Sequence, residues 1–373
     1  MARTYRILIL GASYGSLLGA RLALAGHTVR LVCLPAEAQL INAEGFRVRL
    51  PLKGSISLVE IDSRRVPGAV SASGTNGVDP SAYDLVALAM QEPQYASSGV
   101  RELMRDVALA RVPCMSMMNM PPLTYLARIP GLDVTAFRGC YTDASVWDEF
   151  DPALMTLCSP DPQAFRPPDE KVNVLQVSLP TNFKAARFPS DAHTAILRDL
   201  EADIEASRLQ TPDGPVELPV KLKVHDSIFV PLAKWSMLLT GNYRCVQKDG
   251  MQSIRDAVHA DLDASRAVYA WVADVCKALG ASDRDLVPFE KYANAALGLA
   301  KPSSAARALA AGAKNIERVD QLVQLAGKQK DMRLAAVDKV VELVDSWVAR
   351  NRGADVKSPR APSASSNAAT PAR

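Results

Sequence analysis

The chain has 373 residues, of which 48% are apolar and 22% are charged, and its formal net charge at neutral pH is +3. These values are typical of a soluble globular protein with room for two domains. The Lys and Arg residues are scattered, which argues against nucleic acid as a partner, and no apolar stretch reaches the roughly eighteen residues of a membrane span, so we expect no membrane partner.

The first thirty-odd residues predict a strand, a glycine-rich turn, a helix and a second strand. Residues 4–10 form an apolar run, residues 17–27 have helical spacing, and residues 28–33 are again apolar. A turn in this context lets a phosphate approach backbone N–H groups at a helix N-terminus. It departs from G-x-G-x-x-G, because Ser13 stands where a second glycine is expected and the turn is one residue short.

We expect this turn to hold the pyrophosphate of a dinucleotide. The residues assigned to it are Gly11, Ala12, Ser13, Tyr14, Gly15 and Ser16. On this interpretation a Gly15→Asp change would block binding, because its carboxylate would meet the pyrophosphate.

Strands and helices continue to alternate through the N-terminal half. The predicted elements are a helix over 35–45, strands over 46–50 and 55–61 that pair with each other, a loop over 66–80, a strand over 83–90, a helix over 94–109 and a strand over 112–119. Such alternation implies a parallel sheet that binds ligands at the carboxyl ends of its strands. Gly11, Cys33, Met90 and Asn119 would share that rim, and we expect a dinucleotide to bind across it at residues 11–16, Met90–Gln91 and Asn119.

The pattern changes twice further along the chain. Residues 151–168 contain five prolines and are predicted to be a loop, followed by a strand over 172–179 and a helix over 195–208. After about residue 227 only helical periodicity is found, as over 254–278, 305–324 and 332–348. We therefore expect an α/β fold with a Rossmann-type dinucleotide-binding domain (1–225), an all-helical substrate or dimerisation domain (226–352) and a disordered tail (353–373).

The cysteines and histidines favour a reducing compartment and no metal. The six cysteines are spread without a C-x-x-C pair, which is typical of buried thiols rather than of disulfides or zinc ligands. The four histidines are far apart, so we predict no metal site. The first strand follows directly on the start of the sequence, so we expect no signal peptide and a cytoplasmic location.

Four segments together resemble the ketopantoate reductase (2-dehydropantoate 2-reductase) family. Residues 15–27 resemble its first helix, residues 84–89 the strand that ends near the cofactor, Met117-Met118-Asn119 the strand that ends in the family's Asn-Gly, and 233–242 the helix with the catalytic lysine. In order of elements the likeness extends over roughly residues 4–350. It implies a Rossmann domain, a helical substrate domain, NADP as cofactor with NAD not excluded, and reduction of a 2-keto acid, an oxidoreductase acting on CH–OH groups.

The same resemblance implies roles for individual residues. Lys234 would be the general acid, since hydride addition builds negative charge on the carbonyl oxygen and a lysine can supply the proton there. Asn242, about two helical turns on, would orient the substrate. Asn119 would bridge the nicotinamide ribose and the substrate. Ser303 or Ser304, together with Glu317, would bind the polar groups of the substrate, and of the two serines we assign Ser304.

Several positions depart from the family's pattern. Leu34 stands where NADPH-preferring members have an arginine after the second strand, and Gln91 replaces a lysine near the cofactor. Met120 replaces the glycine after the strand-end asparagine, and Leu238 an asparagine one turn after the lysine. These changes favour a larger or more apolar substrate than ketopantoate.

Two further hypotheses stay open. An opine-dehydrogenase-like enzyme would reduce an imine formed from an amino acid and a keto acid, and His259 with Asp261 or Asp263 could supply its histidine and aspartate. A nucleotide-binding protein without catalysis fits the polar losses at Leu34 and Gln91. In all three cases the partner is a small molecule, and a homodimer is left open.

Overall fold

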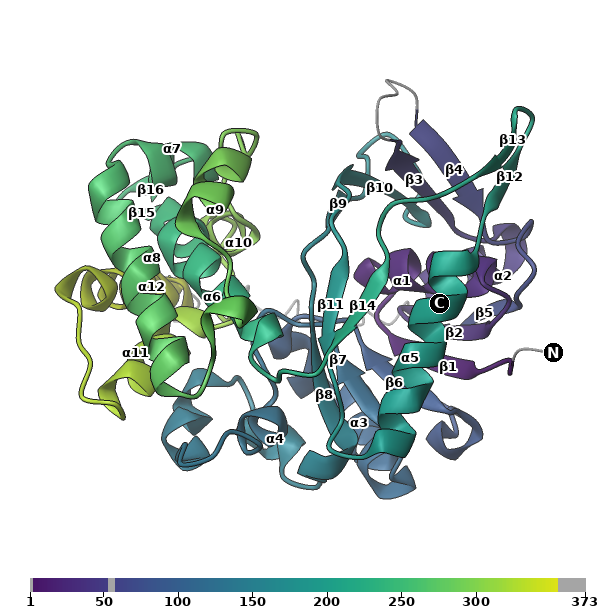
Figure 1. The fold of residues 1–373 in the computed structure, drawn as a ribbon, viewed down its shortest axis with the longest axis horizontal. Helices are drawn as coiled ribbons and strands as arrows, with labels where there is room; N and C mark the ends of the chain where they lie inside the picture. The colour runs from purple at the N-terminus through teal and green to yellow at the C-terminus, as the bar shows by residue number, and fades with distance from the viewer. Residues whose placement is uncertain (1–2, 53–57, 355–373) are drawn as a thin grey trace, which may run out of the picture.

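The computed structural model describes residues 3–52 and 58–354, and it is built on an eight-stranded sheet (Figure 1). Its strands in spatial order are β14 (Leu222–His225), β11 (Phe183–Ala186), β8 (Met155–Ser159), β7 (Cys114–Ser116), β6 (Leu85–Leu88), β1 (Arg6–Leu10), β2 (Thr28–Val32) and β5 (Val70–Ser73). The six strands from β8 to β5 are mutually parallel, whereas β11 pairs antiparallel with β8 and parallel with β14. Counted along the chain, the parallel strands have the 3-2-1-4-5-6 order of a dinucleotide-binding sheet, which confirms the predicted α/β fold with its Rossmann-like parallel sheet.

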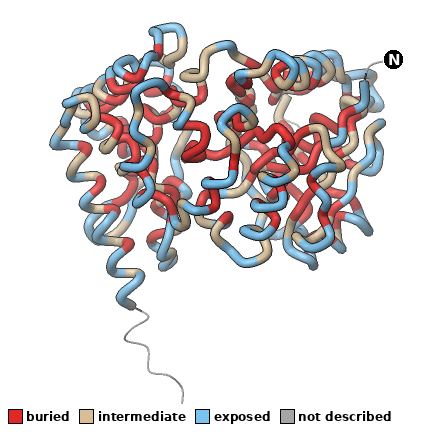
Figure 2. The backbone as a smooth tube through the Cα atoms, turned by 90° about the horizontal axis from the view of Figure 1, so that it is seen from below, coloured by how far each residue is buried: buried red, intermediate tan, exposed pale blue. Residues whose placement is uncertain are grey.

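Helices cover both faces of this sheet because strand β1 is apolar on both sides. Ile7 and Ile9 pack in a cluster with the residues of α1 (Tyr14–Leu24) and α5 (Asp191–Ala206), whereas Leu8 and Leu10 pack in a second cluster with those of α3 (Val100–Ala110). A strand buried on both faces reads as a continuous apolar run, which is the pattern seen in the sequence. In Figure 2 the buried backbone runs through the interior, and the exposed backbone lies on the outer turns.

A smaller sheet lies beside the first one. Its strands in order are β4 (Leu58–Asp62), β3 (Arg47–Pro51), β10 (Val174–Leu179) and β9 (Gln163–Phe165). The predicted pairing of the strands near 46–50 and 55–61 is confirmed as the antiparallel β3–β4 pair, while residues 55–57 of that prediction lie outside the described part of the chain. The short helix α2 (Pro35–Glu44) precedes this sheet and is where the sequence predicted a helix.

Helices dominate the chain after β14. They are α6 (Lys234–Met237), α7 (Ile254–His259), α8 (Leu262–Ala278), α9 (Phe289–Ala296), α10 (Ser304–Ala310), α11 (Val319–Lys328) and α12 (Ala335–Ala354). They gather on one side of the molecule, away from the small sheet (Figure 1). This region was expected to be all helical, but it also contains a hairpin of two short strands, β15 (Val246–Gln247) and β16 (Gly250–Met251). The predicted tail lies outside the described residues from 355 onward.

Three predictions made from local pattern were wrong. The proline-rich stretch 151–168 contains β8, whose five residues are all buried in the large sheet, and also β9. The prolines flank β8, at Pro152 and Pro160, and do not interrupt it. The predicted loop over 66–80 includes the edge strand β5, and the helix predicted over 305–324 is broken between α10 and α11, where Gly312 takes φ +89°.

Candidate active site

The glycine-rich turn joins β1 to α1 at the switch point between β1 and β6, where ligands bind in open α/β sheets. Gly11 has φ +105°, and a Cβ there would lie 2.7 Å from the Ala89 carbonyl oxygen. A Cβ on Gly15 would lie 2.7 Å from Cγ2 of Ile9, inside the core. Gly15 therefore serves close packing of the helix on the sheet, and the expectation that a Gly15 side chain would meet the pyrophosphate was wrong.

The rest of the turn is closed by its own hydrogen bonds. The N–H of Gly11 donates to the Val32 carbonyl, and the N–H of Ser16 to the Ser13 carbonyl. The Ser16 hydroxyl donates to the carbonyl of Ala12 and so holds the turn from inside. Ser13 is exposed, and the first turn of a helix carries N–H groups with no intrahelical acceptor, which are the groups that bind phosphate in dinucleotide-binding folds.

At the end of β2, the residue that follows the rim is Leu34, which is 75% exposed. Arg166, just beyond β9, forms an ion pair with Glu37 of α2, and the Glu37 side chain is 9% exposed. Burial raises the pKa of Glu37 and Arg166 opposes that rise. Arg166 thus brings a positive charge to the rim near the end of β2, where Leu34 supplies no charge.

The predicted substrate residues surround one small cavity next to this rim. It is lined by Gln91, Asn119, Leu238, Asn242, Ser304 and Glu317, among others, and has a volume of about 20 Å³. Such a volume holds about one water molecule, so a substrate requires the cavity to widen. These six side chains come from five separate segments, which the fold brings together around the cavity.

Glu317 is the buried acid of the cavity. Its carboxylate accepts from Nδ2 of Asn119 at 3.2 Å and from the N–H of Glu92 at 3.4 Å. Burial raises the pKa of Glu317 to about 7, against the effect of these two donors. It lies in the segment between α10 and α11 and is buried.

Sequence reasoning missed two neighbours of Glu317. Tyr243 donates its hydroxyl to the Glu317 carbonyl and accepts from the N–H of Val319 at 3.0 Å, which fixes the backbone that follows Glu317. Glu92 is buried and accepts from the N–H and hydroxyl of Thr142. Tyr243 directly follows Asn242 in the sequence, and this position next to a predicted site residue could have identified it as a second one.

Asn242 reaches the cavity through an irregular helix. Residues Leu238–Asn242 form a π-helical turn after α6, a feature often found at functional sites. A Cβ on Gly241 would lie 2.0 Å from the Tyr292 hydroxyl, which donates to the Met237 carbonyl at 3.0 Å. The hydroxyl of Ser303 donates to the Asn242 carbonyl at 2.6 Å, so Ser303 supports the turn and its neighbour Ser304 lines the cavity.

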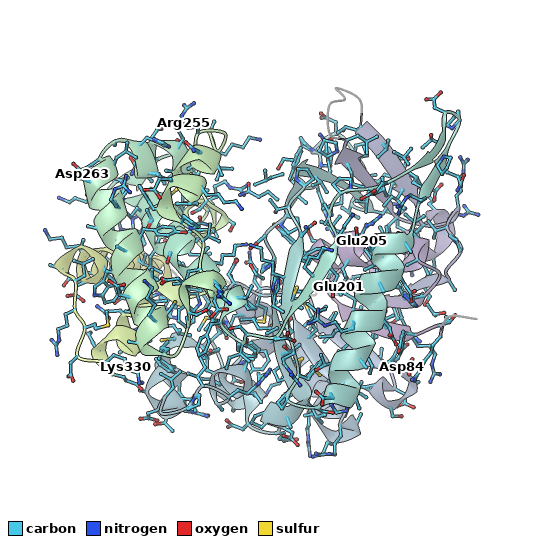
Figure 3. All side chains as sticks on the ribbon, in the orientation of Figure 1. Asp84, Glu201, Glu205, Arg255, Asp263 and Lys330 are labelled. Carbon is cyan, nitrogen blue, oxygen red and sulfur yellow. The ribbon has the colours of Figure 1, made fainter. Side chains whose placement is uncertain are left out.

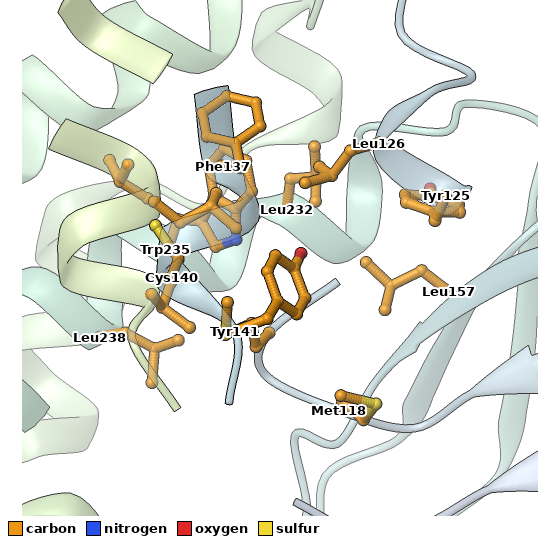
Figure 4. Close-up of a cluster of buried hydrophobic side chains, with 14 of the residues drawn as sticks. Met118, Tyr125, Leu126, Phe137, Cys140, Tyr141, Leu157, Leu232, Trp235 and Leu238 are labelled. Atoms are coloured by element: carbon orange, nitrogen blue, oxygen red, sulfur yellow. The ribbon is translucent and has the colours of Figure 1, made fainter. Parts of the chain in front are cut away.

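Lys234 begins α6 beside the cavity but is turned toward the connection between β8 and β9. Its Nζ donates to the Pro160 carbonyl and lies 3.7 Å from Oδ1 of Asp161. Burial lowers the pKa of Lys234, while Asp161 and Glu317 raise it. The next residue, Trp235, packs with Phe137, Cys140 and Tyr141 (Figure 4), which fixes the start of α6 against the N-terminal half.

The histidine of the opine-like hypothesis lies elsewhere. His259 ends α7, where its Nε2 is 2.9 Å from the Ala293 carbonyl, and Asp261 caps α8 by accepting from the N–H of Ala264. Neither lines the cavity. The structure therefore does not bring this pair to the predicted substrate residues.

Asn119 provides a test of whether a dinucleotide fits. While its Nδ2 donates to Glu317, its Oδ1 is buried and has no hydrogen-bond partner among the described residues. A buried acceptor left without a donor is unfavourable, and a ribose hydroxyl is a donor of the right kind. The turn at Ser13 and the acceptor on Asn119 both lie at the carboxyl rim, so the residues present fit a nicotinamide dinucleotide.

No group of three His, Cys, Asp or Glu residues in the described part of the chain could hold a metal ion. All six cysteines are free, and five of them are buried. Between residues 3 and 354, no described helix is both long enough and apolar enough to cross a membrane.

Replacing Glu317 with glutamine is expected to change how stability depends on pH. A pKa raised in the folded state means that folding favours the protonated acid, so its contribution is complete below the unfolded pKa and is lost as pH rises through about 7. Between pH 5 and pH 8 the free energy of unfolding of the Glu317→Gln protein should therefore rise relative to that of the parent by on the order of 2–3 kcal/mol. Urea unfolding of both proteins at the two pH values measures this, and an equal difference at both would contradict the burial of a titrating acid.

Comparison with solved structures decides the fold. A 2-dehydropantoate 2-reductase from Methylococcus capsulatus superposes with a TM-score of 0.63 at 14% identity, covering 93% of this chain and 97% of that one. The chain has the ketopantoate reductase fold. D-mandelate dehydrogenase, solved with NADH and anilino(oxo)acetate, has a TM-score of 0.60 at 14% identity, covering 93% of this chain and 99% of that one.

A dimeric ketopantoate reductase from Staphylococcus aureus gives a TM-score of 0.56 at 10% identity, covering 93% of this chain and 99% of that one. No family model and no curated protein sequence matches the chain. The ketopantoate reductase fold is therefore shared over nearly the whole length by proteins whose sequences differ at most positions.

Proposed function

We propose that this protein is an NAD(P)H-dependent reductase, a divergent relative of the ketopantoate reductases, that converts a 2-keto acid or related carbonyl to the alcohol. The observation that carries the proposal is the meeting of Asn119, Asn242, Ser304 and Glu317 around one cavity. Lys234, whose side chain is 18% exposed, lies one helical turn before Leu238 of the cavity lining. The glycine-rich turn opens on the same rim. Neighbours in the same fold include oxidoreductases, one of them solved with NADH and a keto-acid analogue.

The nicotinamide, when bound, supplies a hydride to the carbonyl carbon. The chain's own part is to hold the substrate and to move one proton. Lys234 donates that proton to the carbonyl oxygen, and its flexible four-carbon stem lets Nζ turn from the Pro160 carbonyl toward the cavity. Asn242 and Ser304 hydrogen-bond the polar groups of the substrate. Glu317, with a pKa of about 7, hydrogen-bonds a hydroxyl group of the substrate.

The apolar lining favours a substrate larger or less polar than ketopantoate. Leu238 lines the cavity where the resemblance expects an asparagine, and Ile316 and Ala308 line it as well. A pocket that lacks a hydrogen-bonding group no longer prefers a polar substrate over an apolar one. An apolar wall instead binds apolar substrate groups more tightly. An aryl or branched-chain 2-keto acid suits this wall.

A direct assay tests the function. Titration of the nicotinamide fluorescence of NADH and NADPH measures binding, and oxidation of the reduced cofactor is followed with a panel of 2-keto acids from pyruvate to phenylglyoxylate. We expect binding of the cofactor and turnover that improves with the apolar size of the keto acid. Binding without turnover on the whole panel would favour the non-catalytic nucleotide-binding protein, and absence of binding would overturn both.

The choice between cofactors is expected to be weak. Leu34 and Gln91 stand where the resemblance implies two positive charges near the cofactor, and a charge-assisted contact contributes about 1.5–3 kcal/mol. Arg166 reaches this rim, but Glu37 already pairs with it. We therefore expect the Kd values of NADH and NADPH to agree within about tenfold.

Calorimetric titration with each cofactor measures this ratio. A preference for NADPH beyond about tenfold would contradict the expectation, and one beyond about a thousandfold, roughly 4 kcal/mol, would require another cation at the 2′-phosphate. Arg166→Gln, compared with the parent under the same conditions, would then show whether Arg166 supplies the missing charge.

A further inference from the structure

A short connection lies between the glycine-rich turn and Lys234. It runs from Ser159 to Pro162 and joins β8 to β9. On one side the Tyr14 hydroxyl donates to the Pro162 carbonyl at 2.9 Å, and on the other Nζ of Lys234 donates to the Pro160 carbonyl. Two prolines restrict the backbone on either side of Asp161, so this residue is held at a fixed place in the connection.

The Asp161 carboxylate is enclosed by cations. Its Oδ2 lies 2.9 Å from Nζ of Lys184 on β11, its Oδ1 lies 3.7 Å from Nζ of Lys234, and it also accepts from the Ser159 hydroxyl. The Asp161 side chain is 13% exposed, Lys234 18% and Lys184 33%. A buried charge is stable only when it is paired and hydrogen-bonded, and here one carboxylate serves two ammonium groups.

We infer that Asp161 is a positioning residue for Lys234. Together with the Pro160 carbonyl it holds the ammonium at the connection between β8 and β9, from which the lysine stem reaches the cavity, while Lys184 and Ser159 fix the carboxylate. This inference rests on the proposed function, in which Lys234 is the proton donor. It assigns a second task to the connection between β8 and β9, which also anchors Tyr14 of the cofactor turn.

The arrangement explains how a lysine can be buried and still carry a proton. Charged groups face Lys234 from three elements: Asp161 from the connection, Glu317 from the segment before α11, and Lys184 from β11. Burial lowers the pKa of Lys234, Asp161 and Glu317 oppose this, and Lys184 adds to it. Burial also disfavours the Asp161 carboxylate, but Lys234 and Lys184 hold its pKa below the ordinary value.

The two neighbours of Lys234 therefore provide substitutions of opposite sign. Asp161→Asn removes the negative charge and keeps the shape, so Lys234 should lose its proton at lower pH. Lys184→Gln removes a repelling charge and frees Asp161 for Lys234 alone, so Lys234 should lose its proton at higher pH. A residue that merely supports the fold would not give shifts in opposite directions.

The test is a pH titration of the whole protein carrying lysine labelled with ¹³C at Cε, followed by NMR without cofactor or substrate. The resonance that is missing in Lys234→Arg identifies Lys234. We expect its midpoint to move by about one pH unit toward acid in Asp161→Asn and toward base in Lys184→Gln. The same midpoint in the parent and both variants, or a shift in one direction for both, would overturn the inference.

Activity measurements then separate this inference from the proposed function. With a keto acid that is turned over, the basic limb of the kcat/KM profile should move with the NMR midpoint, and Asp161→Glu should restore part of the parent profile. If the NMR midpoints move as expected but no keto acid is reduced, the contact stands and the proposed function fails. If turnover depends on Lys234 and the midpoints do not move, the function stands and the inference fails.

Discussion

Replacing Lys234 with alanine is expected to lower turnover by roughly 10²–10⁴-fold, the usual contribution of a positioned general acid. The alkoxide that forms on hydride addition then has no buried ammonium next to it and must take its proton from water. The affinity for NADH and NADPH should be nearly unchanged, because Nζ of Lys234 contacts the connection between β8 and β9 and not the glycine-rich turn. Steady-state rates and fluorescence titrations of the same preparation measure both quantities.

A surface lysine gives the matched control. Lys223 on β14 pairs with Glu205 of α5, which lies on the outside of the molecule (Figure 3), so Lys223→Ala should turn over like the parent. Removal of Lys234 also leaves Asp161 with one cation fewer, and a thermal melt separates lost stability from lost chemistry. Parent-like turnover in a folded Lys234→Ala protein would remove Lys234 from the mechanism.

Aspartate substitutions at Ser13 and Gly15 are expected to fail in different ways although the two positions are two residues apart. Ser13 is exposed on the turn, so Ser13→Asp should fold normally and bind NADH and NADPH roughly 10–100-fold more weakly, because its carboxylate repels the pyrophosphate. In Gly15→Asp the Cβ meets Ile9 at 2.7 Å and a charge enters the core. That change should destabilise the fold by more than about 4 kcal/mol.

Calorimetry and urea unfolding of both variants decide the matter. Ser13→Ala, which adds no charge, serves as the control and should bind almost like the parent. Parent-like affinity in Ser13→Asp would place the pyrophosphate elsewhere. A stable Gly15→Asp protein that has lost only its cofactor would restore the view that Gly15 faces the ligand.

The sequence alone was sufficient for elements whose pattern is local. The strand, turn and helix over residues 4–24 and the pairing of β3 with β4 depend on contacts between near neighbours, so apolar spacing and turn residues predict them. The resemblance also chose Asn119, Asn242, Ser304 and Glu317, and the structure places all four at one cavity.

Only the tertiary structure decided features that depend on distant partners. Strand β8 lies between prolines, and it forms because β7 and β11 pair with it. The local sequence pattern does not predict this pairing. Glu317 was chosen only by resemblance, and its burial follows from Asn119, some two hundred positions earlier, which donates to its carboxylate. The link from Asp161 to Lys184 and Lys234 crosses three segments, and its electrostatics arise from burial, a property that residue spacing does not contain.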